Sequence, residues 1–189
     1  MEFRDRLEAL LAEVADWAKG RLWYVRAPLL LYFAYVGIRH LGNSEYTSLF
    51  GGINLGIHEA GHLLLMWAPQ FITVFGGTLF QCAAPMVAAW LFLRQPDYFA
   101  VPVCGAWLST NLYSVATYMA DARALELPLV SVGGGDVDHD WNYMLDALGI
   151  ITWDTRLAFI VRVVAFLLMW GSLAAGGWIL TLMARSRRP

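Results

Sequence analysis

The chain has 189 residues, of which 59% are hydrophobic and only 15% are charged, and its formal net charge at pH 7 is −2. In a soluble domain about a quarter of the residues are charged, so this composition argues against a soluble protein and favours an integral membrane protein. The slightly negative charge argues against a nucleic-acid partner.

Residues 1–21 are predicted to form an amphipathic helix. Apolar side chains at Leu7, Leu10, Leu11 and Val14 recur at helical spacing among charged ones. A helix of this kind buries its apolar face either at the membrane surface or against the rest of the protein, and the pattern is compatible with both.

Residues 22–189 are predicted to form one helical bundle in the lipid bilayer. Apolar segments of spanning length occur at about 22–38, 49–68, 71–93, 98–120 and 157–183. Arginines near both ends favour an even number of crossings, whereas these segments number five, so one of them does not cross fully or residues 141–151 enter the membrane. We therefore expect an all-α, polytopic transmembrane bundle of about four to six spans, placed as a multi-pass protein in a bacterial inner membrane.

Two boundaries inside this bundle are open to interpretation. Residues 71–93 are either one helix or a short extended piece at 71–75, a bend at the glycines 76–77 and a helix from Thr78. The helix that begins near Tyr98 is expected to continue to Leu127, before Pro128. Residues 128–156 are predicted to form a glycine-rich, acidic loop.

The segment 49–68 carries the most informative motif of the chain, the HExxH sequence HEAGH at residues 58–62. His58 and His62 lie four residues apart on one face of a helix, where both imidazoles can bind one zinc ion. Glu59 can then act as the general base that takes a proton from water during hydrolysis. The alternative is a histidine pair packed against neighbouring helices, with Glu59 paired to an arginine such as Arg162. Burial of these polar groups without a metal is costly, which favours zinc.

A catalytic zinc site usually has three protein ligands and a water molecule, so the motif needs one more ligand. The main candidates are Asp121, toward the end of the fourth predicted span, and His139, which follows the glycines 133–135. Each also has a purely structural interpretation. Asp121 could be a solvated helix-end residue neutralised by Arg123, and His139 could belong to a surface turn.

Four further residues complete this comparison. Asp138 or Asp140 could orient the imidazole of His139. Asp140 could instead cap the helix that begins at Trp141 or could itself be the third ligand. Asp146 is expected on a helix surface, and His40 is expected to be an interfacial histidine that extends toward the lipid headgroups.

Two polar amides lie within predicted spans. Asn111 and Gln81 are expected to form hydrogen bonds with a neighbouring helix, as buried amides in membranes normally do. In a peptidase, Asn111 could instead bind the substrate strand or the oxyanion.

Together these features resemble the site-2 proteases, which are intramembrane zinc metalloproteases. The resemblance rests on the HExxH helix, the glycine-containing stretch 75–78, and a later span with Asn111 and a carboxylate. It implies zinc on His58 and His62, water activation by Glu59 and a membrane-anchored protein or peptide substrate. In that family an aspartate in an LDG motif is the third ligand. This chain has no LDG; Leu-Asp-Ala at 145–147 is the nearest string.

The glycine-rich segment 133–141 together with HEAGH also resembles a family of small bacterial membrane proteins. The sequence therefore predicts a zinc-dependent intramembrane hydrolase, most simply a metalloprotease that cleaves membrane-associated peptides, with Asp121 or His139 completing the site. A second hypothesis is a non-catalytic membrane subunit of a larger complex with a structural or relict HExxH motif. A third is a zinc hydrolase of a lipid or another small amphiphile.

Overall fold

The computed structural model describes residues 3–128 and 139–186, and these residues form helices without any strand. The order of the elements is α1 (Phe3–Ala18), α2 (Trp23–Gly42), α3 (Gly51–Leu64), α4 (Gln70–Arg94), α5 (Ala100–Ala120), α6 (Asp140–Ala147), a 3₁₀ turn η1 (Ile151–Trp153) and α7 (Asp154–Arg185). The all-α prediction is confirmed for this part of the chain.

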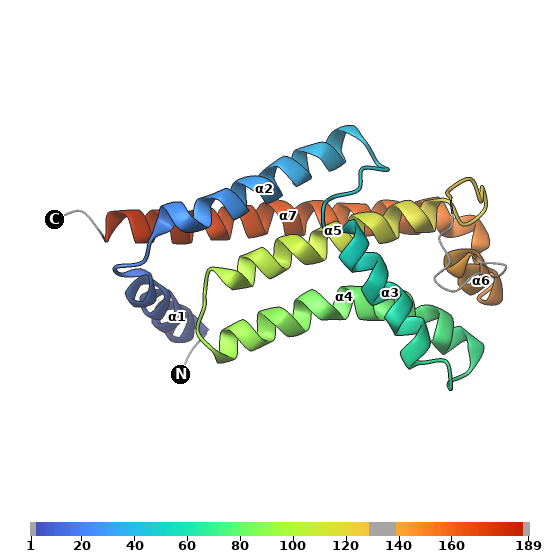
Figure 1. The fold of residues 1–189 in the computed structure, drawn as a ribbon, viewed down its shortest axis with the longest axis horizontal. Coiled ribbons are helices and arrows are strands. Elements are labelled where there is room, and N and C mark those ends of the chain that lie inside the picture. The colour runs from blue at the N-terminus through green and yellow to red at the C-terminus, as the bar shows by residue number, and fades with distance from the viewer. Residues whose placement is uncertain (1–2, 129–138, 187–189) are drawn as a thin grey trace.

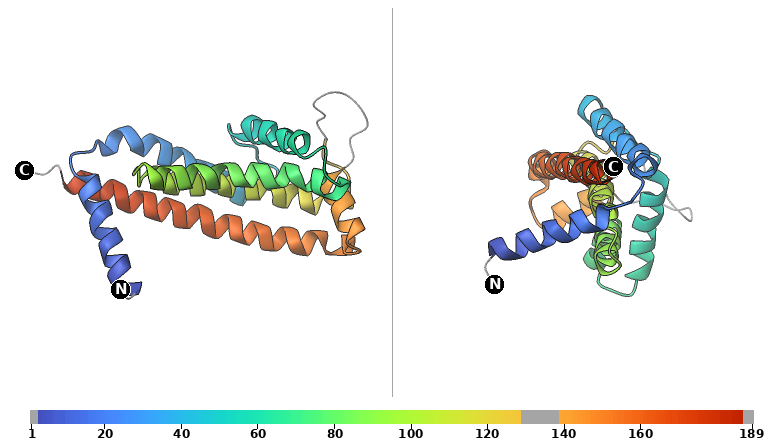
Figure 2. Two further views of the ribbon diagram at one scale, coloured as in Figure 1. Left: turned by 90° about the horizontal axis from the view of Figure 1, so that it is seen from below. Right: turned by 90° about the vertical axis from the view of Figure 1, so that its left-hand side faces the viewer.

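Four long helices, α2, α4, α5 and α7, run alternately in opposite directions along the molecule (Figure 1). α7 packs along α5 and α2, and α4 packs on the other side of α5. Both ends of the chain lie at one end of the bundle, whereas α6 lies at the opposite end (Figures 1 and 2). By length and composition, two stretches are apolar enough to cross a membrane: α4 and residues 151–185, which include α7.

α3 is shorter than its neighbours and lies across α4 (Figure 1). Its 14 residues extend about 21 Å, which is less than the thickness of a bilayer core. The described part of the chain therefore has four long helices, α2, α4, α5 and α7.

Two helix boundaries are settled by local contacts. Residues 71–93 belong to the single helix α4, because the glycines 76 and 77 pack against α3 inside a continuous helix and form no bend. The extension of α5 to Leu127 was wrong, since α5 ends at Ala120. The carboxylate of Asp121 accepts hydrogen bonds from the backbone N–H groups of Glu126 (2.9 Å) and Leu127 (3.1 Å), so the chain turns back there instead of continuing as helix.

α1 divides into two halves with different surroundings, and Figure 2 shows it projecting from the bundle. In the second half, Val14 and Ala18 are buried in a core with α7, and the indole N–H of Trp17 donates to the carbonyl oxygen of Pro96 at 2.7 Å. In the first half, Leu7 and Leu10 remain exposed. A helix is confirmed here over Phe3–Ala18, and both of its expected functions remain compatible with this arrangement.

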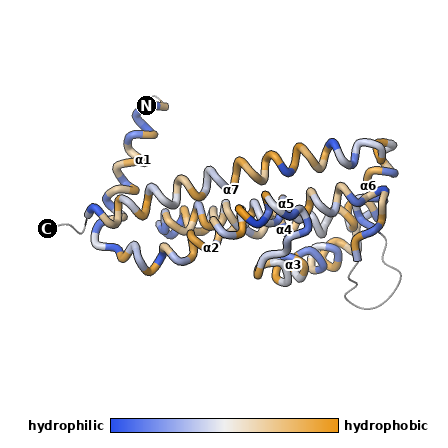
Figure 3. Tube along the Cα trace, turned by 90° about the horizontal axis from the view of Figure 1, so that it is seen from above, coloured by the Kyte–Doolittle hydropathy of each residue, from blue (hydrophilic) through white to orange (hydrophobic). Residues whose placement is uncertain are grey.

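Hydrophobic residues recur along most of α7, as Figure 3 shows. Large side chains such as Phe159, Ile160 and Leu167 are more than half exposed. A monomeric soluble protein rarely leaves such a continuous surface open to water.

α3 and α4 touch backbone to backbone at glycines. A methyl group on Gly61 would lie 2.2 Å from the carbonyl oxygen of Gly76, and one on Gly76 would lie 2.7 Å from the carbonyl oxygen of Gly61. No side chain larger than hydrogen fits at this crossing. The crossing therefore fixes how close the HExxH helix can come to α4.

We predict that Gly61→Ala destabilises the fold, because the methyl group meets rigid backbone and overpacking typically costs about 1–3 kcal/mol. The matched control is Gly56→Ala on the same helix, where a methyl group meets nothing within 4 Å. That variant should gain about 0.5–1 kcal/mol from helix propensity. Thermal unfolding in detergent measures both, and equal midpoints for the two variants would contradict the close-packing argument.

Candidate metal centre

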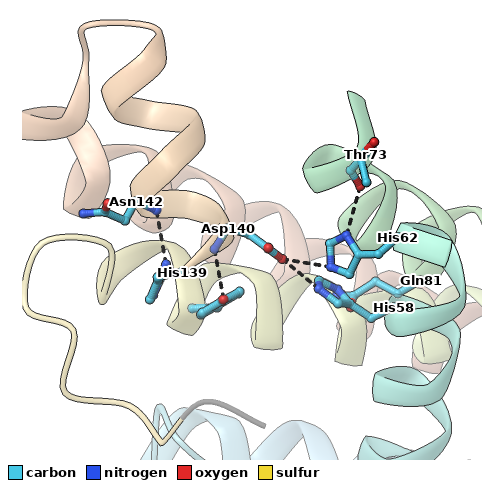
Figure 4. A network of polar contacts seen from close by, with 8 residues as sticks. His58, His62, Thr73, Gln81, His139, Asp140 and Asn142 are labelled. Atoms are coloured by element: carbon cyan, nitrogen blue, oxygen red, sulfur yellow. Dashed lines mark hydrogen bonds and ion pairs between the residues drawn. The ribbon is translucent and has the colours of Figure 1, made fainter. Parts of the chain in front are cut away.

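The two motif histidines are fixed by oxygen atoms of α4 (Figure 4). His58 Nδ1 lies 2.8 Å from the side-chain oxygen of Gln81, and His62 Nδ1 lies 2.9 Å from the backbone carbonyl oxygen of Thr73. Since both oxygens accept hydrogen bonds, each Nδ1 carries a proton and donates it. The other nitrogen of each ring, Nε2, is the one available for a ligand.

Both Nε2 atoms point to the same carboxylate, that of Asp140 at the start of α6 (Figure 4). Asp140 Oδ2 lies 2.9 Å from His58 Nε2 and 3.3 Å from His62 Nε2. The backbone N–H of Asp140 donates to the hydroxyl of Tyr118 on α5 at 3.1 Å, which holds the start of α6 in place. The ligand atoms of His58, His62 and Asp140 all lie within 4.8 Å of one another.

Gly77 of α4 lies directly beside the Nε2 atoms of both histidines. A methyl group there would lie 2.4 Å from His58 Nε2 and 2.6 Å from His62 Nε2. The glycine thus leaves the space beside both nitrogens open, which is where an ion would need room.

The three donors could hold one divalent metal ion. With both Nδ1 atoms already donating, each Nε2 can face a carboxylate only as an N–H donor, which requires two positively charged imidazoles in a buried place. One divalent cation replaces those two protons and satisfies all three side chains. Two imidazole nitrogens and one carboxylate oxygen are also the three-ligand set of catalytic zinc sites, with one position left for water.

The protonation state of Asp140 suits this use. Burial by itself would raise its pKa, but the hydrogen bonds from His58 and His62 outweigh burial and hold the pKa of this carboxyl below its usual range. The side chain is therefore a carboxylate, as a metal ligand must be.

Glu59 is half-buried beside the three donors. It follows His58 directly in α3, the helix that presents both imidazoles. Among the described residues it has neither a hydrogen bond nor an ion pair. The expected alternative pairing with Arg162 is absent, since Arg162 donates to the hydroxyl of Thr117 at 3.2 Å.

Asp121 and His139, the two predicted third ligands, form a separate pair next to the group. His139 Nε2 lies 3.4 Å from Asp121 Oδ2, and His139 Nδ1 accepts from the backbone N–H of Asn142 as the cap of α6. Burial lowers the pKa of His139, although the charges of Asp121 and Asp140 oppose this effect. A neutral imidazole is what the capping contact needs, so this pair supports the start of the helix that presents Asp140.

Arg123 does not neutralise Asp121. Its guanidinium instead forms two hydrogen bonds, of 2.7 and 2.8 Å, with the buried carboxylate of Asp154 at the start of α7. Asp138 and the glycines 133–135 lie outside the described residues. Asp146 is exposed on α6, as expected.

Asn111 is completely buried on α5, and its amide nitrogen donates to the backbone carbonyl oxygen of Gln81 at 2.5 Å. It therefore supports the residue that orients His58. Gln81 forms the expected hydrogen bond with a neighbouring helix, and because its partner is His58 of α3, this bond determines which nitrogen of that ring is free. The contribution of Thr73 comes from its backbone oxygen, for which the sequence carries no signal.

A comparison of the chain with protein-family models finds no match, and comparisons with curated proteins and with solved structures find none either. The assignment of a function therefore depends on the geometry of the site.

We predict that Asp140→Asn lowers the zinc content of the purified protein well below one ion per chain, because a neutral amide is a poor zinc ligand. Asp121→Asn is the matched control, since it removes a buried carboxylate that contacts His139, the residue before Asp140. Elemental mass spectrometry of both variants measures the effect. Loss of zinc in Asp121→Asn with retention in Asp140→Asn would make Asp121 the ligand instead.

We predict that Gln81→Leu weakens zinc binding by about 10–100-fold without abolishing it, because loss of the partner of a metal-binding histidine usually has this effect. Competition with a chromophoric chelator gives the affinity. An affinity equal to that of the wild type would show that the contact between Gln81 and His58 does not orient the ring.

Proposed function

We propose that this chain is a zinc-dependent hydrolase of a membrane, most simply a peptidase that cleaves membrane-associated peptides. The observation that supports it most directly is that both Nδ1 atoms of the HExxH histidines are occupied, while both Nε2 atoms converge on one buried carboxylate. A structural role for the histidines gives no reason for this convergence.

In this proposal each residue has one task. His58, His62 and Asp140 hold the zinc ion, which supplies Lewis acidity that lowers the pKa of a bound water toward neutrality and polarises a carbonyl group. Glu59, which has no partner among the described residues, accepts the proton of the water and passes it to the leaving amine. Tyr118 holds the backbone of Asp140 and thereby positions the third ligand.

The peptidase interpretation is supported by the kind of ligand set. The resemblance to site-2 proteases implies two histidines of HExxH and one aspartate from a later part of the chain, and Asp140 supplies such an aspartate here. It lies on a short helix after α5 and within the sequence His-Asp-Trp, so the LDG context of that family is not needed to provide the carboxylate.

We infer that four helices cross the membrane. α4 and α7 are long and apolar enough to do so by themselves, and α2 and α5 cross beside them. α1, the region where α2 begins and the end of α7 all lie at one end of the bundle (Figure 1). These segments carry five arginines: Arg4, Arg6, Arg21, Arg26 and Arg185. The positive-inside rule assigns this end to the cytoplasm of a bacterial inner membrane. The metal centre then lies toward the opposite face.

The decisive experiment compares Glu59→Gln with His58→Ala in detergent-purified protein. Glu59→Gln should keep about one zinc ion per chain and lose hydrolysis by about 10²–10⁴-fold, because it removes only the base. His58→Ala should lose both. The substrates are a panel of membrane-anchored model peptides and phospholipids, with products identified by mass spectrometry.

The outcomes separate the three hypotheses. Undiminished hydrolysis in Glu59→Gln would rule out the proposed base. Cleavage of phospholipids in place of peptides would favour the lipid hydrolase. Bound zinc in a folded protein that cleaves neither would favour a structural metal site in a subunit of a larger complex.

A further inference from the structure

A second group of polar side chains lies in a cavity on another face of the bundle, away from the metal ligands. The cavity has a volume of about 300 Å³ and is formed by the end of α2, the residues that follow it, α5 and α7. His40, Tyr113 and Arg162 are among the residues that line it. None of these is a zinc ligand in the proposed function, so the inference below shares its membrane placement but is independent of its zinc chemistry.

Two residues that line this cavity carry three polar atoms that are buried without partners. Both ring nitrogens of His40 and the hydroxyl of Tyr113 have no hydrogen bond in the described part of the chain. His40 is 7% exposed and Tyr113 is 4% exposed, and their rings stack with centroids 4.3 Å apart and an interplanar angle of 8°. The expectation that His40 extends toward lipid headgroups was wrong, because α2 packs this side chain onto α5. Such unpaired polar groups lower stability unless a ligand satisfies them.

Arg162 gives the cavity a positive charge. Its guanidinium has five N–H donors, of which one reaches the hydroxyl of Thr117, and no carboxylate among the described residues pairs with it. Thr117 in turn donates to the backbone carbonyl of Ser44 at 2.6 Å, so the guanidinium is held at the wall of the cavity. The described lining contains no acidic residue. A cavity with an unpaired cation and unused donors suits an anion with several acceptor oxygens.

The rim of the cavity indicates what carries this anion. Phe159, Val163 and Phe166 line it on one face of α7, and their side chains are 68%, 40% and 39% exposed. This stretch of α7 is apolar enough to cross a membrane. A ligand that fills the cavity therefore meets hydrogen-bond donors and a cation at one end. Beside them it meets the apolar track, which is the row formed by Phe159, Val163 and Phe166. An anionic lipid, with a charged headgroup and an apolar chain, matches both.

We propose that this cavity binds the phosphate group of an anionic phospholipid, with its acyl chain along Phe159, Val163 and Phe166. Arg162 supplies the charge, and Tyr113 and His40 supply hydrogen bonds to the phosphate oxygens. Free phosphate shares the headgroup chemistry but would leave the apolar track without a partner.

The test uses native mass spectrometry of the detergent-purified full chain with a phosphatidylglycerol, with a diacylglycerol of the same acyl chains and with inorganic phosphate. Phosphatidylglycerol should bind at least about tenfold more tightly than either of the others, since a charge-assisted contact of this kind is worth about one decade or more in affinity. Equal affinity for diacylglycerol would overturn the phosphate site. Equal affinity for inorganic phosphate would overturn the lipid as its source.

Variants assign the effect to the cavity. Arg162→Gln should weaken the binding of phosphatidylglycerol about tenfold or more. Arg156→Gln, an exposed arginine of the same helix that rests on Trp153 and does not line the cavity, should leave binding unchanged. The same loss in both variants would show nonspecific attraction and overturn the site.

Tyr113→Phe provides a second measure in case Arg162→Gln does not fold. It removes only the hydroxyl and keeps the ring that stacks on His40, so the melting temperature without lipid should be unchanged or higher, because a buried unpaired group is lost. The rise in melting temperature on adding phosphatidylglycerol should be smaller than in the wild type. A full rise in this variant would show that the hydroxyl does not contact the lipid, contrary to the proposal.

Discussion

The contact between glycine backbones of α3 and α4 is the constraint on which the candidate metal centre depends. Gly61 and Gly76 allow the two helices to approach more closely than any side chain would permit, and Gly77 then faces the two imidazoles directly. At that separation the oxygens of Gln81 and Thr73 reach the Nδ1 atoms of His58 and His62. A wider crossing would leave both rings free to rotate, and the convergence of the Nε2 atoms would be lost.

The second requirement is electrostatic. Asp140 is buried, and the two rings that face it can approach a carboxylate only as charged donors or through a cation. Asp140 lies at the start of α6, and two contacts hold it there: His139 caps the helix, and the backbone N–H of Asp140 donates a hydrogen bond to Tyr118. Asp121 stabilises the turn after α5 and contacts His139, so it acts on the site through the backbone that leads to Asp140.

The sequence predicted the features that depend on local residue spacing and missed those that depend on how the helices pack against one another. Four-residue spacing placed His58 and His62 on one face, and apolar length located every long helix. The path of residues 71–77 was ambiguous because Gly76-Gly77 favours a bend locally, and only the contact with α3 explains a continuous helix.

The same reason accounts for the third donor. Asp121 and Asp140 are both acidic residues near helix ends, and nothing in their neighbours shows which faces α3. That depends on how α6 packs against α4 and α5, which is a long-range property. His40 was misjudged in the same way, because its place at the end of an apolar segment carried no information about Tyr113, far away in the sequence.

The division of the three donors between α3 and α6 has a mechanical consequence. An ion bound to His58, His62 and Asp140 would be a removable cross-link between segments far apart in the chain, and closing such a large loop strongly restricts the unfolded ensemble. The hydrophobic core at the other end, formed by residues of α1, α2 and α7 together with Tyr98 and Phe99, contains none of these residues. Chelation would therefore loosen one end of the molecule before the other, so that unfolding separates into two cooperative units with different sensitivity to metal.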